Sequence, residues 1–144
     1  MVPALAARKE PFDQSELSQL HVVRTYLRSR WPDFPDEFSS DQLEAMRAAY
    51  ARIAPTPSRF QREVSAELEA MGWRHAFEHQ TAAGFSLDLA KTEAKQAVEI
   101  DGPSHFLRDS QRRFVPNGAT LFKRRLLRDL GWSVASVSFF EWTG

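Results

Sequence analysis

The sequence predicts a mixed α/β domain preceded by a helical extension. Amphipathic patterns at helical spacing fill much of the first 57 residues, and from residue 58 the patterns follow the order helix, three strands, helix, strand. The chain has 144 residues, 42% of them hydrophobic, which suffices for one compact core. We therefore expect a helical extension over residues 1–57 and one α/β domain over residues 58–144.

Two helices are expected in the N-terminal extension. Residues 13–31 place leucines and valines on one stripe, with Asp13 or Ser15 available as the N-cap. Residues 39–54 form a second pattern, with an apolar stripe of Leu43, Met46, Tyr50 and Ile53. Prolines between the two patterns exclude a continuous helix. Such a helix pair is typical of a packing appendage or of the end of a helical-repeat array.

The α/β domain begins with a strong helical pattern. Ser58 is placed to cap this helix, and Gly72 is placed to end it in the left-handed conformation. Its apolar stripe consists of Phe60, Val64, Leu68 and Met71. The patterns that follow are strands at residues 73–80, 84–91 and 96–101, a helix at 119–131 and a strand at 132–140. Because the last pattern is apolar on both sides, it predicts an internal strand.

The composition excludes several kinds of site. With no cysteine, the chain has neither disulfides nor thiolate metal sites, which leaves carboxylates and four histidines as strong metal ligands. No apolar run is long enough to cross a bilayer, so we expect no membrane partner. The first ten residues lack the apolar core of a secretory signal, and we expect the chain to be cut from a longer one.

The net charge of zero conceals two adjacent blocks of opposite sign. Residues 78–101 hold five acids against two lysines, and residues 102–131 hold seven Lys and Arg against two acids. Either block alone is typical of a solvated face, but a nucleic-acid enzyme needs cations for phosphates beside acids for a metal. The arginines expected to contact phosphates are Arg108, Arg112, Arg113, Arg124, Arg125 and Arg128.

Acids on neighbouring strands come together in one particular hairpin register. If Lys91 faces Gln96, then Asp88 lies opposite Glu99, and Asp101 points to the same side. Like charges directly opposite each other are destabilising, and a divalent cation between them would compensate. Ligation by oxygen alone favours magnesium, manganese or calcium over zinc. The alternative is another register, in which these acids lie on a solvated sheet face.

Three further side chains are candidates for the same site. Glu67 lies inside the edge of the apolar stripe of its helix, so it is expected to look inward, unless it is an ordinary surface glutamate. Lys123 falls on the buried side of its helix, where it either extends to solvent or meets an acid. The exposed side of that helix is expected to carry Arg124, Arg125 and Arg128. His105 is a general base, a phosphate donor or a capped structural histidine.

Four segments together resemble a RAP domain, the module found at the C-terminus of organellar RNA-processing proteins. They read REVSAELEAMGW, FSLDLA, AVEIDGPSHF and NGATLFKRRLLRDLGWSVASVSFFEW, within roughly residues 58–142. The resemblance implies a restriction-endonuclease-like core of the PD-(D/E)XK type with a mixed sheet, close to the very short patch repair endonucleases. It also implies a mitochondrial or chloroplast protein whose helical-repeat array reads single-stranded RNA, either a transcript or ribosomal RNA.

The resemblance assigns roles to individual residues. Asp88 matches the first acid of the nuclease motif and Glu99 the second, so these two are the implied ligands of Mg²⁺ or Mn²⁺. Asp101 stands where the motif has a lysine that positions or deprotonates the attacking water. Lys123 is the candidate to replace that lysine from another element. His105 matches the histidine that follows the Asp-Gly-Pro turn.

Functions from different classes fit these residues. We favour an RNA-binding module of nuclease-like fold that stabilises or positions RNA, because Asp101 replaces the motif lysine. A metal-dependent endoribonuclease is the alternative, with Lys123 or His105 managing proton and charge. A structural module of an organellar ribonucleoprotein assembly fits the same sequence. One geometric expectation bears on the mechanism: the Lys123 ammonium should lie within hydrogen-bonding reach of Asp88, Glu99 or Asp101.

Overall fold

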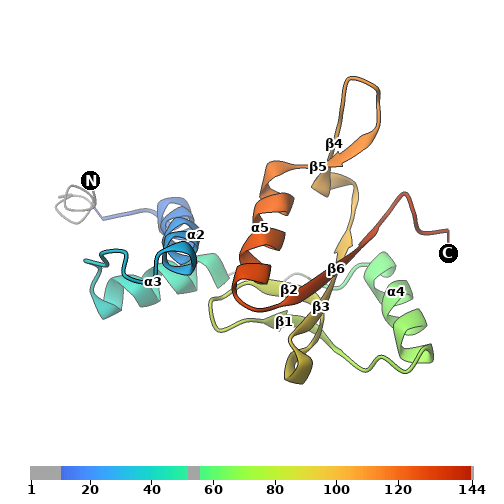
Figure 1. Cartoon of the computed structure of the whole chain (residues 1–144), viewed down its shortest axis with the longest axis horizontal. Coiled ribbons are helices and arrows are strands. Elements are labelled where there is room, and N and C mark those ends of the chain that lie inside the picture. Colours follow the sequence, from blue (N-terminus) through green and yellow to red (C-terminus); the bar gives the residue numbers. More distant parts are fainter. Residues whose placement is uncertain (1–10, 52–55, 144) are drawn as a thin grey trace. The chain divides into compact units, whose positions relative to one another are not determined.

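The computed structural model describes residues 11–51 and 56–143, which form two compact units (Figure 1). The described residues of the first, the helical unit, are 11–51 and the loop 80–86. Those of the second, the α/β unit, are 56–79 and 87–143. Within this described part of the chain, no helix has both the length and the apolar character needed to cross a bilayer.

The helical unit contains the two expected helices, α2 at Gln14–Arg30 and α3 at Ser40–Ala51. Asp13 caps α2, because its side chain accepts from the Glu16 N–H while the Glu16 carboxylate accepts from the Asp13 N–H. Of the two N-cap candidates, Asp13 and Ser15, the helix uses Asp13. Of the stripe expected on the second helix, Met46 is buried, and Ile53 lies outside the described residues.

The core of the helical unit is built around a buried histidine. His21 is 6% exposed, and its ring lies 5.3 Å from the ring of Tyr50 and 6.1 Å from that of Phe85. Its Nε2 donates to the carbonyl of Ala83. The loop 80–86 therefore supplies both an aromatic ring and a hydrogen-bond acceptor to this core.

The α/β unit has a four-stranded mixed sheet in the order β1-β2-β3-β6. Its strands are β1 at Ala76–Gln80, β2 at Ser86–Lys91, β3 at Gln96–Asp101 and β6 at Ser133–Ser138. Strands β2 and β3 are antiparallel, whereas β3 and β6 are parallel. The helices α4, at Arg59–Ala70, and α5, at Gly118–Asp129, lie on opposite sides of this sheet (Figure 1). The expected mixed α/β fold is confirmed.

Local sequence signals fix the ends of both helices. Ser58 and Gln61 form a capping box at the start of α4, and the Asn117 side chain accepts from the Thr120 N–H at the start of α5. Gly72 and Gly131, with φ of 85° and 91°, follow the two helices in the left-handed conformation that glycine adopts at little cost.

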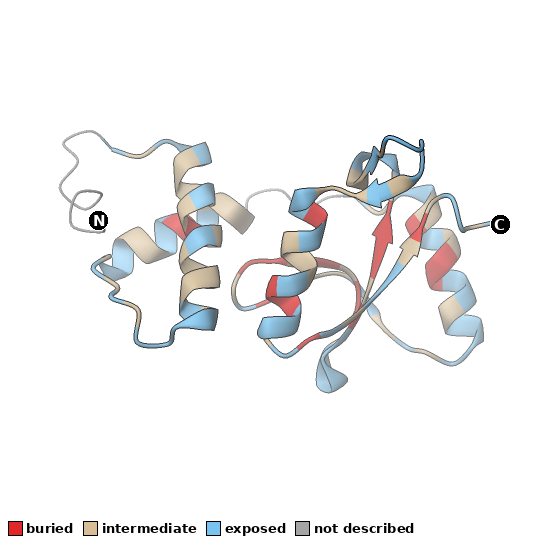
Figure 2. Cartoon of the chain, turned by 45° about the horizontal axis from the view of Figure 1, so that its top comes forward, coloured by how far each residue is buried: buried red, intermediate tan, exposed pale blue. Residues whose placement is uncertain are grey.

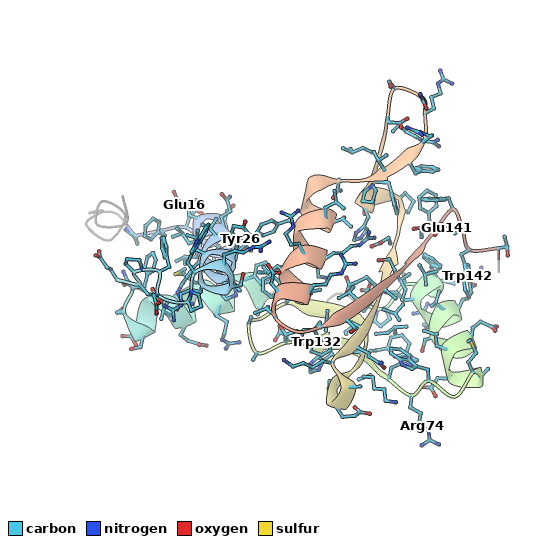
Figure 3. The ribbon with its side chains drawn as sticks, viewed as in Figure 1. Glu16, Tyr26, Arg74, Trp132, Glu141 and Trp142 are labelled. Atoms are coloured by element: carbon cyan, nitrogen blue, oxygen red, sulfur yellow. The ribbon has the colours of Figure 1, made fainter. Side chains whose placement is uncertain are left out.

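The hydrophobic core lies between α4 and the sheet, where Val64, Leu89 and Ile100 are buried against each other. Residues packed around them are Phe60, Leu68, Trp73, Val98, Val137 and Trp142, the last of which lies beside α4 in Figure 3. On the other face, Leu126 and Leu127 of α5 are fully buried, and Figure 2 shows buried residues concentrated in the sheet and on the inner sides of both helices.

The hairpin register is the predicted one, because Lys91 pairs with Gln96, Ala90 with Ala97 and Leu89 with Val98. Side chains alternate across a strand, so the even-numbered residues of β3 pack against α4. Glu99 and Asp101 therefore face α5. This alternation positions the acids of the candidate site.

Two features of the sheet region differ from expectation. β6 was predicted to be internal, but it is a terminal strand of the described sheet, because it pairs with β3 alone. One face of it is also less covered than the apolar pattern of residues 132–140 indicated, since Ala135 and Ser136 are exposed. A hairpin of β4, at Phe106–Arg108, and β5, at Phe114–Pro116, was not expected. Each of its strands has three residues, which is too short to give a periodic signal.

Candidate functional site

The carboxylate of Glu99 meets a lysine from the opposite helix. The side chain of Glu99 is 5% exposed, and its Oε2 accepts from Lys123 Nζ at 2.7 Å. Burial raises the pKa of Glu99, and the nearby Asp88 carboxylate adds to this shift, although Lys123 opposes it. The Lys123 ammonium was expected within hydrogen-bonding reach of Asp88, Glu99 or Asp101, and it reaches Glu99.

Asp101 is matched by a second base from the same helix. The Asp101 side chain is 2% exposed, and its Oδ2 accepts from Arg124 Nη2 in an ion pair. Arg124 was expected on the exposed side of its helix, and that expectation was wrong, because its side chain is only 15% exposed and its guanidinium pairs with Asp101 on β3. Arg124 follows Lys123 directly, so the inner face of α5 reaches both acids of β3.

The Asp88 side chain, within β2, is held by two donors. Its Oδ1 accepts from Gln61 Nε2 at 2.7 Å, and its Oδ2 accepts from the Ile100 N–H at 2.7 Å. The Asp88 N–H lies 3.4 Å from Glu99 Oε1, so the two acids are neighbours, as the register requires. The Asp88 carboxylate thus extends the β2–β3 pairing through its side chain.

The glutamate expected to look inward from α4 does not do so. Glu67 is exposed, because the buried face of α4 is rotated towards Gln61 and Ser65. Gln61 takes the inward position, and its Nε2 donates to Glu78 at 3.2 Å as well as to Asp88. No role was predicted for Gln61 from the sequence, although a glutamine three residues after Ser58 is the pattern of a capping box.

His105 bridges the end of β3 to the start of α5. It ends the short 3₁₀ turn η2, at Pro103–His105, and its Nδ1 lies 3.4 Å from Asp101 Oδ1 and 3.2 Å from Thr120 Oγ1. Its carbonyl accepts from the Asn117 N–H at 2.8 Å. Of the three roles considered, the geometry supplies the contacts of a structural histidine that keeps 41% of its side chain exposed.

The donor set of this region consists of oxygen ligands already engaged with protein groups. Among residues 11–51 and 56–143, no cluster of three or more His, Asp and Glu side chains is arranged to hold a metal ion. Asp88 and Glu99 remain an adjacent pair of carboxylates, the type of donor that Mg²⁺ and Mn²⁺ prefer.

Comparison with known proteins identifies the C-terminal region. Residues 98–144 match the family model described as RAP domain. A curated protein of Oryza sativa subsp. japonica, named RAP domain-containing protein, chloroplastic, is 41% identical to this chain over 134 residues. The chain carries a RAP domain. The matched stretch covers 90% of this chain but spans only about a fifth (20%) of the relative's length.

Some arginines of the RAP domain form ion pairs with acids, and others are exposed on its surface. Arg124 is committed to Asp101, and Arg113 pairs with Asp109 at 2.8 Å while remaining 70% exposed. Arg125 and Arg128 lie on the exposed side of α5, as expected. Arg108 and Arg112 are exposed on the β4–β5 hairpin, which projects beyond the N-terminal end of α5 (Figure 1). Cationic side chains thus run from the hairpin along the outer face of α5.

Proposed function

We propose that this RAP domain binds single-stranded RNA through the arginines of its hairpin and of the outer face of α5. The observation that carries the proposal is the division of the bases on α5. Lys123 and Arg124 neutralise the buried acids of β3, whereas Arg125 and Arg128 remain exposed on the same helix, which follows the cationic hairpin in the chain. Acid and base therefore cancel inside the unit, and the cationic charge on this surface is available to phosphates.

The biological setting follows from the relative and from the family resemblance. The name of the rice protein places that protein in the chloroplast. We extend an organellar location to this chain, with the chloroplast favoured over the mitochondrion, and a role in processing or stabilising organellar transcripts or ribosomal RNA. A longer protein with a helical-repeat array is the proposed context.

The salt dependence of binding tests the proposal. Replacing Arg125 and Arg128 together by alanine should reduce the slope of log affinity against log salt by about one to two units, because each lost phosphate contact releases one counterion fewer. Fluorescence anisotropy with a labelled oligouridine at several salt concentrations measures this slope.

Arg74→Ala is the matched control for the slope. Arg74 is also exposed, lies in the loop between α4 and β1, and extends away from the sheet in Figure 3. Its replacement should leave the slope unchanged. Equal slopes for the unmodified chain, the double variant and the control would mean that RNA binds another surface. No binding by the unmodified chain would refute the proposal.

Metal-dependent RNA cleavage is the second candidate, favoured by the contact of Lys123 with Glu99. Asp88 and Glu99 are the pair that would hold Mg²⁺ or Mn²⁺, and such an ion would lower the pKa of a bound water and polarise the phosphate. The Lys123 ammonium, 2.7 Å from Glu99, would then offset negative charge at the reacting phosphate. Its present role as the partner of Glu99 competes with that task.

A cleavage assay separates the two candidates. Labelled single-stranded RNA incubated with the chain, with and without manganese, should remain intact if the domain only binds. If metal-dependent cleavage occurs, Lys123→Met should abolish it and leave RNA affinity within a few fold, because one cation contributes far more to a charged transition state than to binding. Asp88→Asn should then abolish any thermal stabilisation by magnesium or manganese.

A further inference from the structure

Four phenylalanines from separate segments of the α/β unit pack into one cluster. The phenylalanine cluster consists of Phe106 and Phe114, on the β4–β5 hairpin, and Phe139 and Phe140, which follow β6. Ring centroids of its members lie between 4.7 and 6.1 Å apart. The Phe139 N–H donates to the Asp101 carbonyl at 3.0 Å, and the Glu141 N–H donates to the Ser138 carbonyl at 3.0 Å. The backbone after β6 therefore holds the cluster in a defined turn.

Within the cluster, two rings and a guanidinium form a continuous stack. The Phe140 ring is parallel to that of Phe114 within 10°, with centroids 4.7 Å apart. Arg108 Cζ lies 3.6 Å from the Phe114 ring centroid. A group this close and a parallel ring cannot share one face of Phe114, so Arg108 covers one face and Phe140 the other. Arg108 Nη1 also donates to the Arg112 carbonyl, which fixes the guanidinium in place.

The outer end of this stack is open to solvent. Phe140 is 44% exposed, although its ring is large and apolar. The inner face of Phe140 lies against Phe114, and Phe106 and Phe139 approach it at steep interplanar angles of 74° and 89°, as edge contacts do. The exposed part of Phe140 therefore includes the outer face of its ring, on which a further planar group would extend the stack.

We propose that the exposed face of Phe140 stacks an unpaired nucleobase of single-stranded RNA, with the hairpin arginines contacting the adjoining phosphates. This inference rests on the proposed RNA binding and assigns it a base-contacting site. Charge complementarity favours a nucleotide over an apolar peptide, because Arg108, Arg112 and Arg113 lie on the same hairpin as Phe114. Stacking is tolerant of sequence because every base has a π face, so the site would bind unpaired bases with little sequence preference.

The backbone of the hairpin tip supports a site that projects cations. Arg112 adopts φ of 60°, a conformation uncommon for residues other than glycine, and its N–H donates to the Asp109 carbonyl at 2.9 Å. The Asp109 carboxylate accepts from the backbone and side chain of Arg113. These contacts hold the tip in one conformation while Arg112 stays exposed.

Comparing a base-containing ligand with one that lacks bases tests the proposal. The probes are an oligouridine of about 12 nucleotides, within the range that single-strand-binding folds occupy, and an abasic chain of equal length. Phe140→Leu in the 144-residue chain should weaken oligouridine binding roughly 5- to 150-fold, the range measured for loss of one base–aromatic stack. Its affinity for the abasic chain and its salt slope should match those of the unmodified protein, because stacking releases no counterions.

Two further variants make the test specific to an aromatic face at this position. Phe140→Trp should retain oligouridine affinity, since the indole ring also stacks. Phe77→Leu is the matched control, because Phe77 on β1 is 42% exposed in the same unit and should tolerate the change without loss of affinity. Equal affinity of Phe140→Leu and the unmodified chain for oligouridine would overturn the stacking site and leave RNA binding standing. An equal loss for the abasic chain would also overturn it, whereas no binding by the unmodified chain would overturn the proposed function itself.

Discussion

His21 in the helical unit and Asp101 in the α/β unit are both almost wholly buried, yet the surrounding residues differ in kind. His21 has aromatic neighbours and donates to a backbone carbonyl, and burial lowers its pKa, so the neutral ring is favoured. Asp101 faces the guanidinium of Arg124. One unit therefore buries an ionisable side chain by keeping it neutral, and the other buries a charge by pairing it.

The α/β unit has a second buried acid on β3, Glu99, that is also paired with a base. Glu99 pairs with Lys123 at 2.7 Å, and Asp101 pairs with Arg124. The two bases are consecutive on α5, and the two acids are two residues apart on β3. Removing one member of such a pair leaves a charge in a poorly solvated site, whereas removing a neutral hydrogen-bonding group leaves only an unmet donor or acceptor. The comparison therefore predicts that substitutions will be costlier in the paired region.

The largest effect is expected at Arg124. Arg124→Met keeps much of the side-chain volume but leaves the Asp101 carboxylate buried without its base, which should cost about 3–5 kcal/mol of the free energy of unfolding. Urea unfolding of the two proteins measures this difference. Arg125→Met is the control from the next position of the same helix, where the side chain is exposed, and it should leave the unfolding midpoint almost unchanged. Similar midpoints for both variants would contradict the pairing argument.

A smaller effect is expected at the neighbouring pair. Lys123→Met should cost about 1–3 kcal/mol, because Lys123 is 30% exposed against 15% for Arg124, and Glu99 keeps its contact with the Asp88 N–H. The same urea series measures it. A larger loss for Lys123→Met than for Arg124→Met would reverse the ranking that burial predicts.

Much of this arrangement could be predicted from the sequence. A hairpin in which Lys91 faces Gln96, together with the alternation in residues 96–101, predicts Asp88 beside Glu99, and the structure has that register. The helical phase of Lys123 predicts it on the buried side of its helix, where it contacts Glu99. Both inferences depend on periodicity, which a single strand or helix carries in its own residues.

Other features depend on how elements meet, and the sequence does not carry that information locally. The helical phase predicts Arg124 on the exposed side of its helix, whereas in the structure it pairs with Asp101 on the neighbouring strand. The prediction that Glu67 points inward was wrong for a related reason. The way α4 packs on the sheet turns Gln61 inward, where it contacts Asp88, and leaves Glu67 exposed. The phenylalanine cluster joins segments that are separated along the chain, so no local sequence pattern predicts its contacts.

The smallest predicted effect concerns pH and belongs to the helical unit. His21 has a folded-state pKa below its ordinary value of 6.5, chiefly because burial disfavours the charged ring and also because Arg24 and Arg47 repel it, while the Ala83 carbonyl opposes the shift. The unfolded chain therefore takes up a proton before the folded one does. Stability from this group is fully present above about pH 6.5 and is lost as pH falls from there towards the folded pKa. Each unit of pKa difference is worth about 1.4 kcal/mol.

His21→Gln separates this contribution from every other titrating group. The glutamine amide can still donate to the Ala83 carbonyl but does not titrate, so the variant should lose less stability than the unmodified chain between about pH 7 and pH 5. Urea unfolding at a series of pH values gives the difference, which should narrow steadily as the pH falls. The paired acids of the α/β unit are common to both proteins and cancel in the comparison. A difference that stays constant across the series would mean that His21 keeps its ordinary pKa in the folded chain, and that the helical unit does not exclude the charged ring as its burial implies.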